Sequence, residues 1–246
     1  MPALIRRGAD WQRRSESCRL VNSEFRILNS EFARLTAILD ADAAARAGWP
    51  ILDLAAAYLR GGARFLQLRA KSLGGDALLA TASAVVQLAR SHQARVIVND
   101  RADIARLADA DGVHVGQDDL QPAHVRTLVG VDALVGLSTH TIAQLERAIL
   151  EPVSYVAIGP VFSTATKATG YDAIGLPMVH EAARRARAAG VPLVAIGGIT
   201  LDNAASVLAS GAASVAVIGD LLSTGDPEAR VRAFVERLSR SEWPRV

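Results

Sequence analysis

The sequence predicts an α/β protein that folds as a single (β/α)8 barrel, a TIM barrel. Short apolar runs alternate with longer segments of helical spacing, which is typical of parallel βαβ units. Eight such repeats occupy roughly 210 residues, close to the length of one barrel. The chain is 50% hydrophobic but only 4% aromatic, and this aliphatic bias favours an α/β architecture over a β-sandwich.

Eight apolar runs are expected to form the strands of the barrel. They cover residues 35–39, 65–68, 96–98, 113–115, 134–137, 155–158, 193–196 and 215–218. Helical spacing of Ala, Leu and Arg is clearest over residues 53–60, 77–90, 142–150, 178–189 and 228–238. An open, doubly wound sheet is the competing architecture. However, no GxGxxG motif follows the first run, and eight strands are the number that closes a barrel.

The first 32 residues differ from the rest of the chain. They are rich in Arg and Ser and repeat the string NSEF at 22–25 and 29–32. We expect residues 1–32 to be a disordered extension, with a targeting or partner-binding arm as the alternative, and residues 33–246 to be the catalytic barrel. The extension holds six of the 27 basic and four of the 25 acidic residues, which accounts for the whole net charge of +2.

A neutral barrel argues against a nucleic-acid partner, which would require a clustered basic face. No apolar run approaches the length of a membrane span, and the N-terminus lacks the apolar core of a secretory signal. The single cysteine, Cys18, excludes a disulfide within the chain and fits a cytoplasmic location. Whether the chain forms a homo-oligomer is left open.

Chemistry in a TIM barrel takes place at the carboxyl ends of the strands, so the polar residues that end the apolar runs should form one site. Gln67 and Arg69 alternate with leucines and share one face of the second strand, and Lys71 follows. An Arg and a Lys at this position can bind a diphosphate. The alternative is a pair of surface cations that merely end the strand.

Two carboxylates at neighbouring strand ends suggest a magnesium site. Asp100 follows the third run and Asp119 the fourth, and Mg²⁺ needs only one or two carboxylates besides water and substrate oxygens. Asp100 could instead cap the helix that begins near Ala102, and Asp118 is the weaker candidate because it could cap the next helix.

Two further segments suit phosphate groups. The loop after the sixth run, GPVFSTATK, carries two hydroxyls and an ammonium in Thr164, Thr166 and Lys167. Glycine-containing strings follow the seventh and eighth runs, where barrels often bind a phosphomonoester with backbone N–H groups. Each string alone is a weak signal, but the two at these positions together predict a phosphate cup.

The histidines give less information. His114 alternates into the wall of the fourth strand and is expected to be a packed core residue. His140 follows the fifth strand and suits either an acid/base or a positioning role. No His, Cys or Glu cluster has the spacing of a zinc site.

Over residues 34–240 the chain closely resembles the thiamine phosphate synthase family. The matching strings are QLRAK (67–71), VNDR (98–101), GVHVGQDD (112–119), GLSTHT (136–141), GPVFSTATK (159–167), AIGGIT (195–200) and SVAVIGD (214–220). The family joins 4-amino-2-methyl-5-hydroxymethylpyrimidine diphosphate to 4-methyl-5-(2-hydroxyethyl)thiazole phosphate. Its products are thiamine phosphate and diphosphate.

The resemblance implies a role for each matching position. The residues implied to hold the pyrimidine diphosphate are Gln67, Arg69, Lys71, Asn99, Ser138 and Lys167, of which Arg69, Lys71, Ser138 and Lys167 would be catalytic. Asp100 and Asp119 would hold Mg²⁺. The thiazole phosphate would be held by Thr164, Thr166, Gly198, Ile218 and Gly219.

The sequence departs from the family pattern at two of these strings. Ala70 stands where the family usually has Glu, and Gly219 stands where it usually has Ser. Two other functions stay open on the sequence: a thiazole tautomerase of the same barrel family, with His140 as its acid/base group, and a non-catalytic phosphate-binding barrel. The first would need no metal and no diphosphate site.

Overall fold

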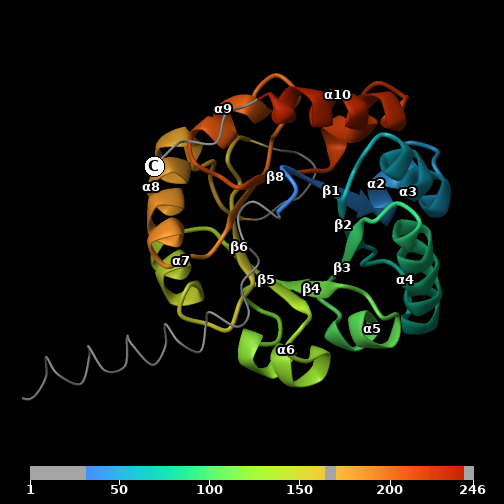
Figure 1. Cartoon of the computed structure of the whole chain (residues 1–246), viewed down its shortest axis with the longest axis horizontal. Coiled ribbons are helices and arrows are strands. Elements are labelled where there is room, and N and C mark those ends of the chain that lie inside the picture. The colour runs from blue at the N-terminus through green and yellow to red at the C-terminus, as the bar shows by residue number, and fades with distance from the viewer. Residues whose placement is uncertain (1–31, 164–169, 241–246) are drawn as a thin grey trace, which may run out of the picture.

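Eight parallel strands close into a barrel in which each strand is hydrogen-bonded to the next and the last to the first (Figure 1). The computed structural model describes residues 32–163 and 170–240. The strands are β1 (Leu35–Asp40), β2 (Phe65–Arg69), β3 (Arg95–Asn99), β4 (Gly112–Val115), β5 (Leu134–Thr139), β6 (Tyr155–Ile158), β7 (Leu193–Ile196) and β8 (Ser214–Val217). The predicted (β/α)8 barrel is therefore confirmed, and the alternative of an open, doubly wound sheet is excluded.

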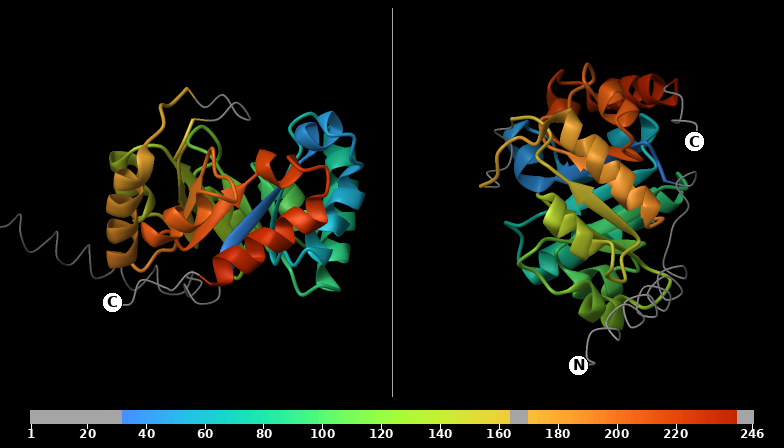
Figure 2. Two further views of the ribbon diagram at one scale, coloured as in Figure 1. Left: turned by 90° about the horizontal axis from the view of Figure 1, so that it is seen from above. Right: turned by 90° about the vertical axis from the view of Figure 1, so that its left-hand side faces the viewer.

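Helices surround the barrel and cover the outer faces of the strands (Figures 1 and 2). They are α2 (Ala41–Arg46), α3 (Ile51–Arg60), α4 (Gly75–Arg90), α5 (Ala102–Leu107), α6 (Pro122–Val129), α7 (Ile142–Ala148), α8 (Gly175–Ala188), α9 (Ala204–Ala209) and α10 (Pro227–Ser239), with a short 3-10 helix, η2 (Gly219–Leu222), after β8. The sequence prediction gave α3, α4, α7, α8 and α10 within three residues of these bounds. It missed α2, α5, α6 and α9, whose six to eight residues give few turns in which a period can be recognised.

The apolar side chains form two cores. The larger core lies between the outward faces of the strands and the helices. The smaller core fills the barrel interior near the amino ends of the strands. In the smaller core, Phe32 packs on Phe65 and Tyr155 with ring centroids 4.7 and 5.2 Å apart. This aromatic cluster closes the end of the barrel opposite the carboxyl ends of the strands.

The position of Phe32 differs from the expectation for the N-terminal segment. Assigned to the extension by its place in the NSEF repeat, Phe32 is instead 3% exposed and part of the barrel core. The rest of the expected extension, residues 1–31, lies outside the described residues.

Inward-facing residues change character along the barrel axis. Above the aromatic cluster the interior becomes polar: Gln67, His114 and Asp40 are all buried there. Since period-two alternation sends one side chain in two inward, each strand delivers polar groups to the same end of the barrel. This polar end is where the candidate site lies.

Candidate active site

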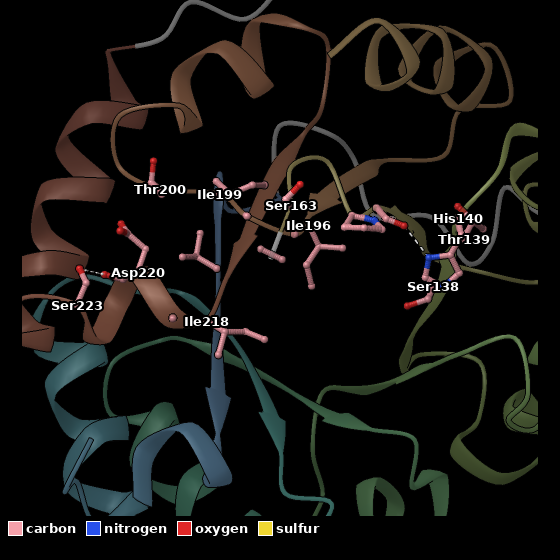
Figure 3. Close-up of a pocket in the computed structure, with 17 residues that line it drawn as sticks. Ser138, Thr139, His140, Ser163, Ile196, Ile199, Thr200, Ile218, Asp220 and Ser223 are labelled. Carbon is pink, nitrogen blue, oxygen red and sulfur yellow. Dashed lines mark hydrogen bonds between the residues drawn. The ribbon is translucent and has the colours of Figure 1, made fainter. Parts of the chain in front are cut away.

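A cavity of about 380 Å³ opens at the carboxyl ends of strands β5 to β8. Ser138 and His140 lie on one side of it, and Thr200, Asp220 and Ser223 lie on the other (Figure 3). Three predicted phosphate-site residues line its wall, namely Gly198, Ile218 and Gly219. The cavity is large enough for a small phosphorylated heterocycle.

Backbone geometry explains the glycines in this wall. Gly197 and Gly198 have positive φ angles of +103° and +64°, which L side chains rarely adopt. A Cβ at Gly198 would lie 2.7 Å from both the Phe162 Cβ and the Ser163 carbonyl oxygen. The close approach of these two loops therefore requires glycine, and it leaves main-chain groups exposed to the cavity.

A partly buried ion pair braces the same wall. The Asp220 carboxylate accepts hydrogen bonds from Arg230 Nη2 (2.7 Å) and Nε (3.1 Å), and also from the Leu201 N–H (3.0 Å). Asp220 thus joins the loop after β7 to η2 and α10. Asp220 is therefore placed to shape the cup.

Next to the large cavity, a smaller chamber of about 40 Å³ lies inside the barrel mouth. Four residues predicted to bind the diphosphate substrate line it, which are Gln67, Arg69, Asn99 and Ser138. Ser138, Ile196 and Ile218 line both spaces. The two predicted subsites are therefore adjacent and share a wall.

Arg69 is held by a partner that the sequence analysis did not identify. Its Nη1 donates to Asp40 Oδ2, while Asp40 Oδ1 caps helix α2 by accepting from the Ala43 N–H at 2.8 Å. Asp40 is 4% exposed. Asp40 directly follows the first apolar run, just as Asp100 and Asp119 follow the third and fourth. This position is the sequence signal that would have marked Asp40 as a site residue.

The two predicted metal ligands lie beside Lys71. The Lys71 Nζ is 2.9 Å from Asp100 Oδ2, and Asp119 Oδ2 accepts from the Gly116 N–H at 2.8 Å. Partial burial raises the pKa of Asp119, and hydrogen bonding and charge repulsion from Asp100 raise it further. Asp100 and Asp119 therefore lie close enough for their charges to interact.

The alternative roles of these aspartates as helix caps are not observed. Arg101 occupies the N-cap position of α5, and Gln121 occupies that of α6, so neither Asp100 nor Asp118 caps its helix. Asp100 has a positive φ of 63°. Such a backbone is uncommon outside glycine and is often found at functional positions.

Metal-binding geometry is otherwise sparse. Among the residues that the structure describes, no group of three or more His, Cys, Asp or Glu side chains could hold a metal ion. A magnesium ion does not need such a group, since it keeps several waters and takes oxygens from its substrate.

Ser138 lies at the end of a hydrogen-bonded pair of buried side chains. His114 Nε2 is 2.8 Å from Ser138 Oγ, and His114 Nδ1 is 2.9 Å from the Tyr155 hydroxyl oxygen. His114 is buried, as expected, but it also contacts a predicted substrate-binding residue. The sequence pattern marks Tyr155 only as the first residue of an apolar strand and does not predict this contact.

His140 stands at the edge of the large cavity. Its Nδ1 donates to the Gly159 carbonyl oxygen at 2.6 Å, and its ring stacks on Tyr171 with centroids 4.0 Å apart and an interplanar angle of 12°. These contacts fix the orientation of the imidazole ring. Thr164, Thr166 and Lys167, the hydroxyls and ammonium of the predicted loop, lie outside the described residues.

The profile of the family described as thiamine monophosphate synthase matches residues 35–221, which span all eight strands. The chain belongs to this family. It is therefore an enzyme, and the prediction of a transferase of thiamine biosynthesis is confirmed at the level of the family.

Individual relatives agree with this assignment. The chain is 42% identical over 186 residues to the thiamine-phosphate synthase of Roseiflexus castenholzii, covering 76% of this chain and 80% of that one. It is 45% identical over 195 residues to that of Anaeromyxobacter dehalogenans, covering 77% and 86%. The structure of thiamine phosphate pyrophosphorylase from Pyrococcus furiosus superposes with a TM-score of 0.76 at 26% identity, covering 90% and 98%.

None of the helices within residues 32–163 and 170–240 is long and apolar enough to cross a membrane.

Proposed function

We propose that this member of the family joins 4-amino-2-methyl-5-hydroxymethylpyrimidine diphosphate to 4-methyl-5-(2-hydroxyethyl)thiazole phosphate, with Mg²⁺ as cofactor. The observation that carries the proposal is the pair of adjoining spaces at the barrel mouth. One is lined by glycine backbone and braced by Asp220, and the other is lined by charged and amide side chains. Two anionic substrates can therefore meet across Ser138.

The charged side chains at the ends of β1 to β4, of which Arg69 lines the chamber, explain why a cation would be needed there. The described residues supply two positive side chains, Arg69 and Lys71, against three carboxylates, Asp40, Asp100 and Asp119. A diphosphate would meet net negative charge from this group. Asp100 and Asp119 fit a hard divalent cation because their oxygens are the ligands Mg²⁺ prefers. Bound there, it would neutralise charge that develops on the departing diphosphate.

The chain's own groups would act on the same charge. Two cationic side chains in the described part of the chain can donate to the phosphoryl oxygens, Arg69 and Lys71. Asp40 orients Arg69, and Lys71 is paired with Asp100. Asn99 and Ser138 add neutral polar contacts, and Lys167 is proposed as a further cation. Donors fixed before the reaction stabilise a leaving group at little reorganisation cost.

The reaction then proceeds by dissociation and capture. The bond between the pyrimidine methylene carbon and the diphosphate oxygen breaks, and its electron pair leaves with the diphosphate. The thiazole nitrogen, held across the shared wall by its phosphate in the cup of Gly198, Ile218 and Gly219, donates its lone pair to the methylene cation. No proton is lost at that nitrogen, so the step requires no protein base. Thr164 and Thr166 are proposed as further donors to the thiazole phosphate.

The proposal is tested by measuring diphosphate release from the purified full-length protein. Release should require both substrates and Mg²⁺, and it should be lost in Asp100→Asn and in Asp119→Asn. Asp118→Asn is the matched control, because Asp118 is an exposed carboxylate next to Asp119 in the chain. Failure of release by protein that still binds the thiazole phosphate would refute the synthase. Tautomerisation of a thiazole phosphate by that protein would instead favour the isomerase, and its absence a non-catalytic barrel.

A further inference from the structure

A chain of four polar side chains crosses the barrel interior and lines the smaller chamber of the site. It runs from Gln67 to the Tyr155 hydroxyl, from there to His114, and from His114 to Ser138. The first three side chains are almost fully shielded, with Gln67 6%, Tyr155 1% and His114 7% exposed. Only Ser138 reaches the large cavity.

The barrel is built to bring this chain together. His114 on β4 is paired with Gly136 on β5, and Gly136 is paired with Tyr155 on β6. A Cβ at position 136 would lie 2.4 Å from His114 Nδ1 and 2.4 Å from the Tyr155 hydroxyl oxygen. Because Gly136 has no side chain, His114 and Tyr155 can come into contact in the space that a Cβ would otherwise occupy.

The distances allow two directions of donation along this chain, and the two differ in the tautomer of His114. In the first direction Tyr155 donates to His114 Nδ1, and His114 carries its own proton on Nε2, facing Ser138. In the second, His114 Nδ1 donates to the Tyr155 oxygen and the Ser138 hydroxyl donates to Nε2. Only the first direction leaves the Ser138 hydrogen available to a ligand in the cavity that Ser138 lines.

We infer that the chain takes the first direction, and that Tyr155 and His114 are positioning residues that orient the Ser138 hydroxyl. When Ser138 Oγ accepts from His114 Nε2, its own hydrogen is directed away from the imidazole and toward a ligand in the cavity. An anionic phosphoryl oxygen needs a donor at that point, and a serine whose proton pointed back to the histidine would present only lone pairs. The choice of direction rests on the anionic ligand of the proposed function.

The tautomer of His114 tests the direction without any turnover. Long-range ¹H–¹⁵N correlation spectra of the histidine-labelled full-length protein contain five imidazoles, and His114→Gln identifies the signals of His114. We expect a protonated Nε2 and an unprotonated Nδ1 in the wild type. In Tyr155→Phe, which removes the donor to Nδ1 but keeps the ring, we expect this preference to weaken. A wild-type His114 protonated on Nδ1 would overturn the inference.

The effect on the ligand is tested with a double-mutant cycle of Tyr155→Phe and Ser138→Ala. The readouts are the Kd of Mg²⁺-diphosphate and kcat/KM for the pyrimidine diphosphate. Tyr155→Phe should weaken both by about tenfold, the scale of one hydrogen bond to a charged group. Adding Tyr155→Phe to Ser138→Ala should cost little more, because the tyrosine acts through the serine. KM for the thiazole phosphate should stay within about twofold of wild type.

The control is Tyr58→Phe, which deletes the hydroxyl of another fully buried tyrosine. The Tyr58 hydroxyl has no hydrogen-bond partner within the described part of the chain, so this change should leave Kd and kcat/KM unchanged. Equal losses in the two tyrosine variants, or fully additive losses in the cycle, would show a general packing effect and overturn the inference. If the expected tautomer is found but no variant or wild type releases diphosphate, the proposed function fails and the hydrogen-bond direction stands.

Discussion

Asp40 and Arg69 form an ion pair between the ends of β1 and β2, and Arg69 lines the chamber proposed to hold the diphosphate. The side chain of Asp40 is 4% exposed and that of Arg69 is 17% exposed. The register aligns the two residues directly, since Asp40 pairs with Arg69 across the two strands. The guanidinium is thus fixed before any ligand arrives, although 29 residues separate the two in the chain.

The first prediction concerns the charge of Asp40. Asp40→Asn should lower the free energy of unfolding by about 3 kcal/mol, because it leaves a largely buried guanidinium without its counter-charge. The amide can still cap α2 through its oxygen. Asp40→Ala should cost about 1 kcal/mol more, since it also removes the cap on the Ala43 N–H. Urea denaturation followed by circular dichroism measures both.

Asp53→Asn, in the exposed first turn of α3, is the matched control and should change stability by less than about 0.5 kcal/mol. An equal effect of Asp40→Asn and Asp53→Asn would mean that the Asp40–Arg69 pair contributes nothing measurable.

The second prediction compares the two buried tyrosines for stability. Tyr155→Phe should destabilise the protein by about 1–3 kcal/mol, because it leaves buried groups of His114 and Gln67 without their partner. Tyr58→Phe should be neutral or stabilising, since the Tyr58 hydroxyl is buried without a partner among the described residues. Thermal and urea unfolding measure the stability of both variants. A larger loss of stability in Tyr58→Phe than in Tyr155→Phe would contradict this account.

The third prediction concerns the brace of the phosphate cup. Arg230→Met removes two hydrogen bonds to the Asp220 carboxylate and one to the Asp220 carbonyl oxygen, but keeps the aliphatic part of the side chain. It should raise KM for the thiazole phosphate by about tenfold, the scale of one charge-assisted hydrogen bond lost from the wall. KM for the pyrimidine diphosphate should stay near wild type.

Arg232→Met serves as the control on the same helix, because within the described part of the chain the ion pair of Arg232 is an exposed i,i+4 pair with Glu228. Steady-state kinetics with each substrate varied in turn give the two KM values for each variant. A rise in both KM values, or a similar rise in the Arg232 variant, would argue against a local effect on the cup.

The fourth prediction separates backbone strain from steric collision at glycine. Gly225→Ala introduces a Cβ at a φ of +77° with nothing within 4 Å, and should cost about 1–2 kcal/mol of stability. Gly198→Ala has a similar φ of +64° but adds contacts of 2.7 Å to Phe162 and Ser163. It should cost clearly more and should weaken binding of the thiazole phosphate, whereas Gly225→Ala should not. Equal unfolding energies for the two variants would show that the loop relaxes freely.

The fifth prediction is a pH dependence of magnesium binding. The pKa of Asp119 is raised above its ordinary value of 3.8, mainly by burial and further by Asp100. The folded protein therefore takes up a proton on Asp119 at a higher pH than an unperturbed carboxyl would, and that proton competes with the cation. Calorimetric titration should show Mg²⁺ affinity already falling at mildly acidic pH. Asp119→Asn should bind Mg²⁺ weakly at every pH, whereas Asp118→Asn should reproduce the wild-type profile.

The barrel, its strands and the set of polar residues at the strand ends could all be predicted from the amino-acid sequence. These features are local: a period of two assigns the face of Gln67 and Arg69, and helical spacing marks the segments between strands. The strings around Asp100, Asp119 and Gly198 carried the resemblance to the family, which the comparisons confirm.

Which of these groups contact one another follows from the three-dimensional fold and could not be predicted from the sequence pattern. Closure and stagger of the barrel pair Asp40 with Arg69 and place Tyr155 beside His114 over the gap left by Gly136. They also draw Phe32 into the core and out of the expected extension. A linear pattern specifies the face on which a side chain lies. The partner across the barrel depends on strand register, which is set by the packing of the whole closed sheet.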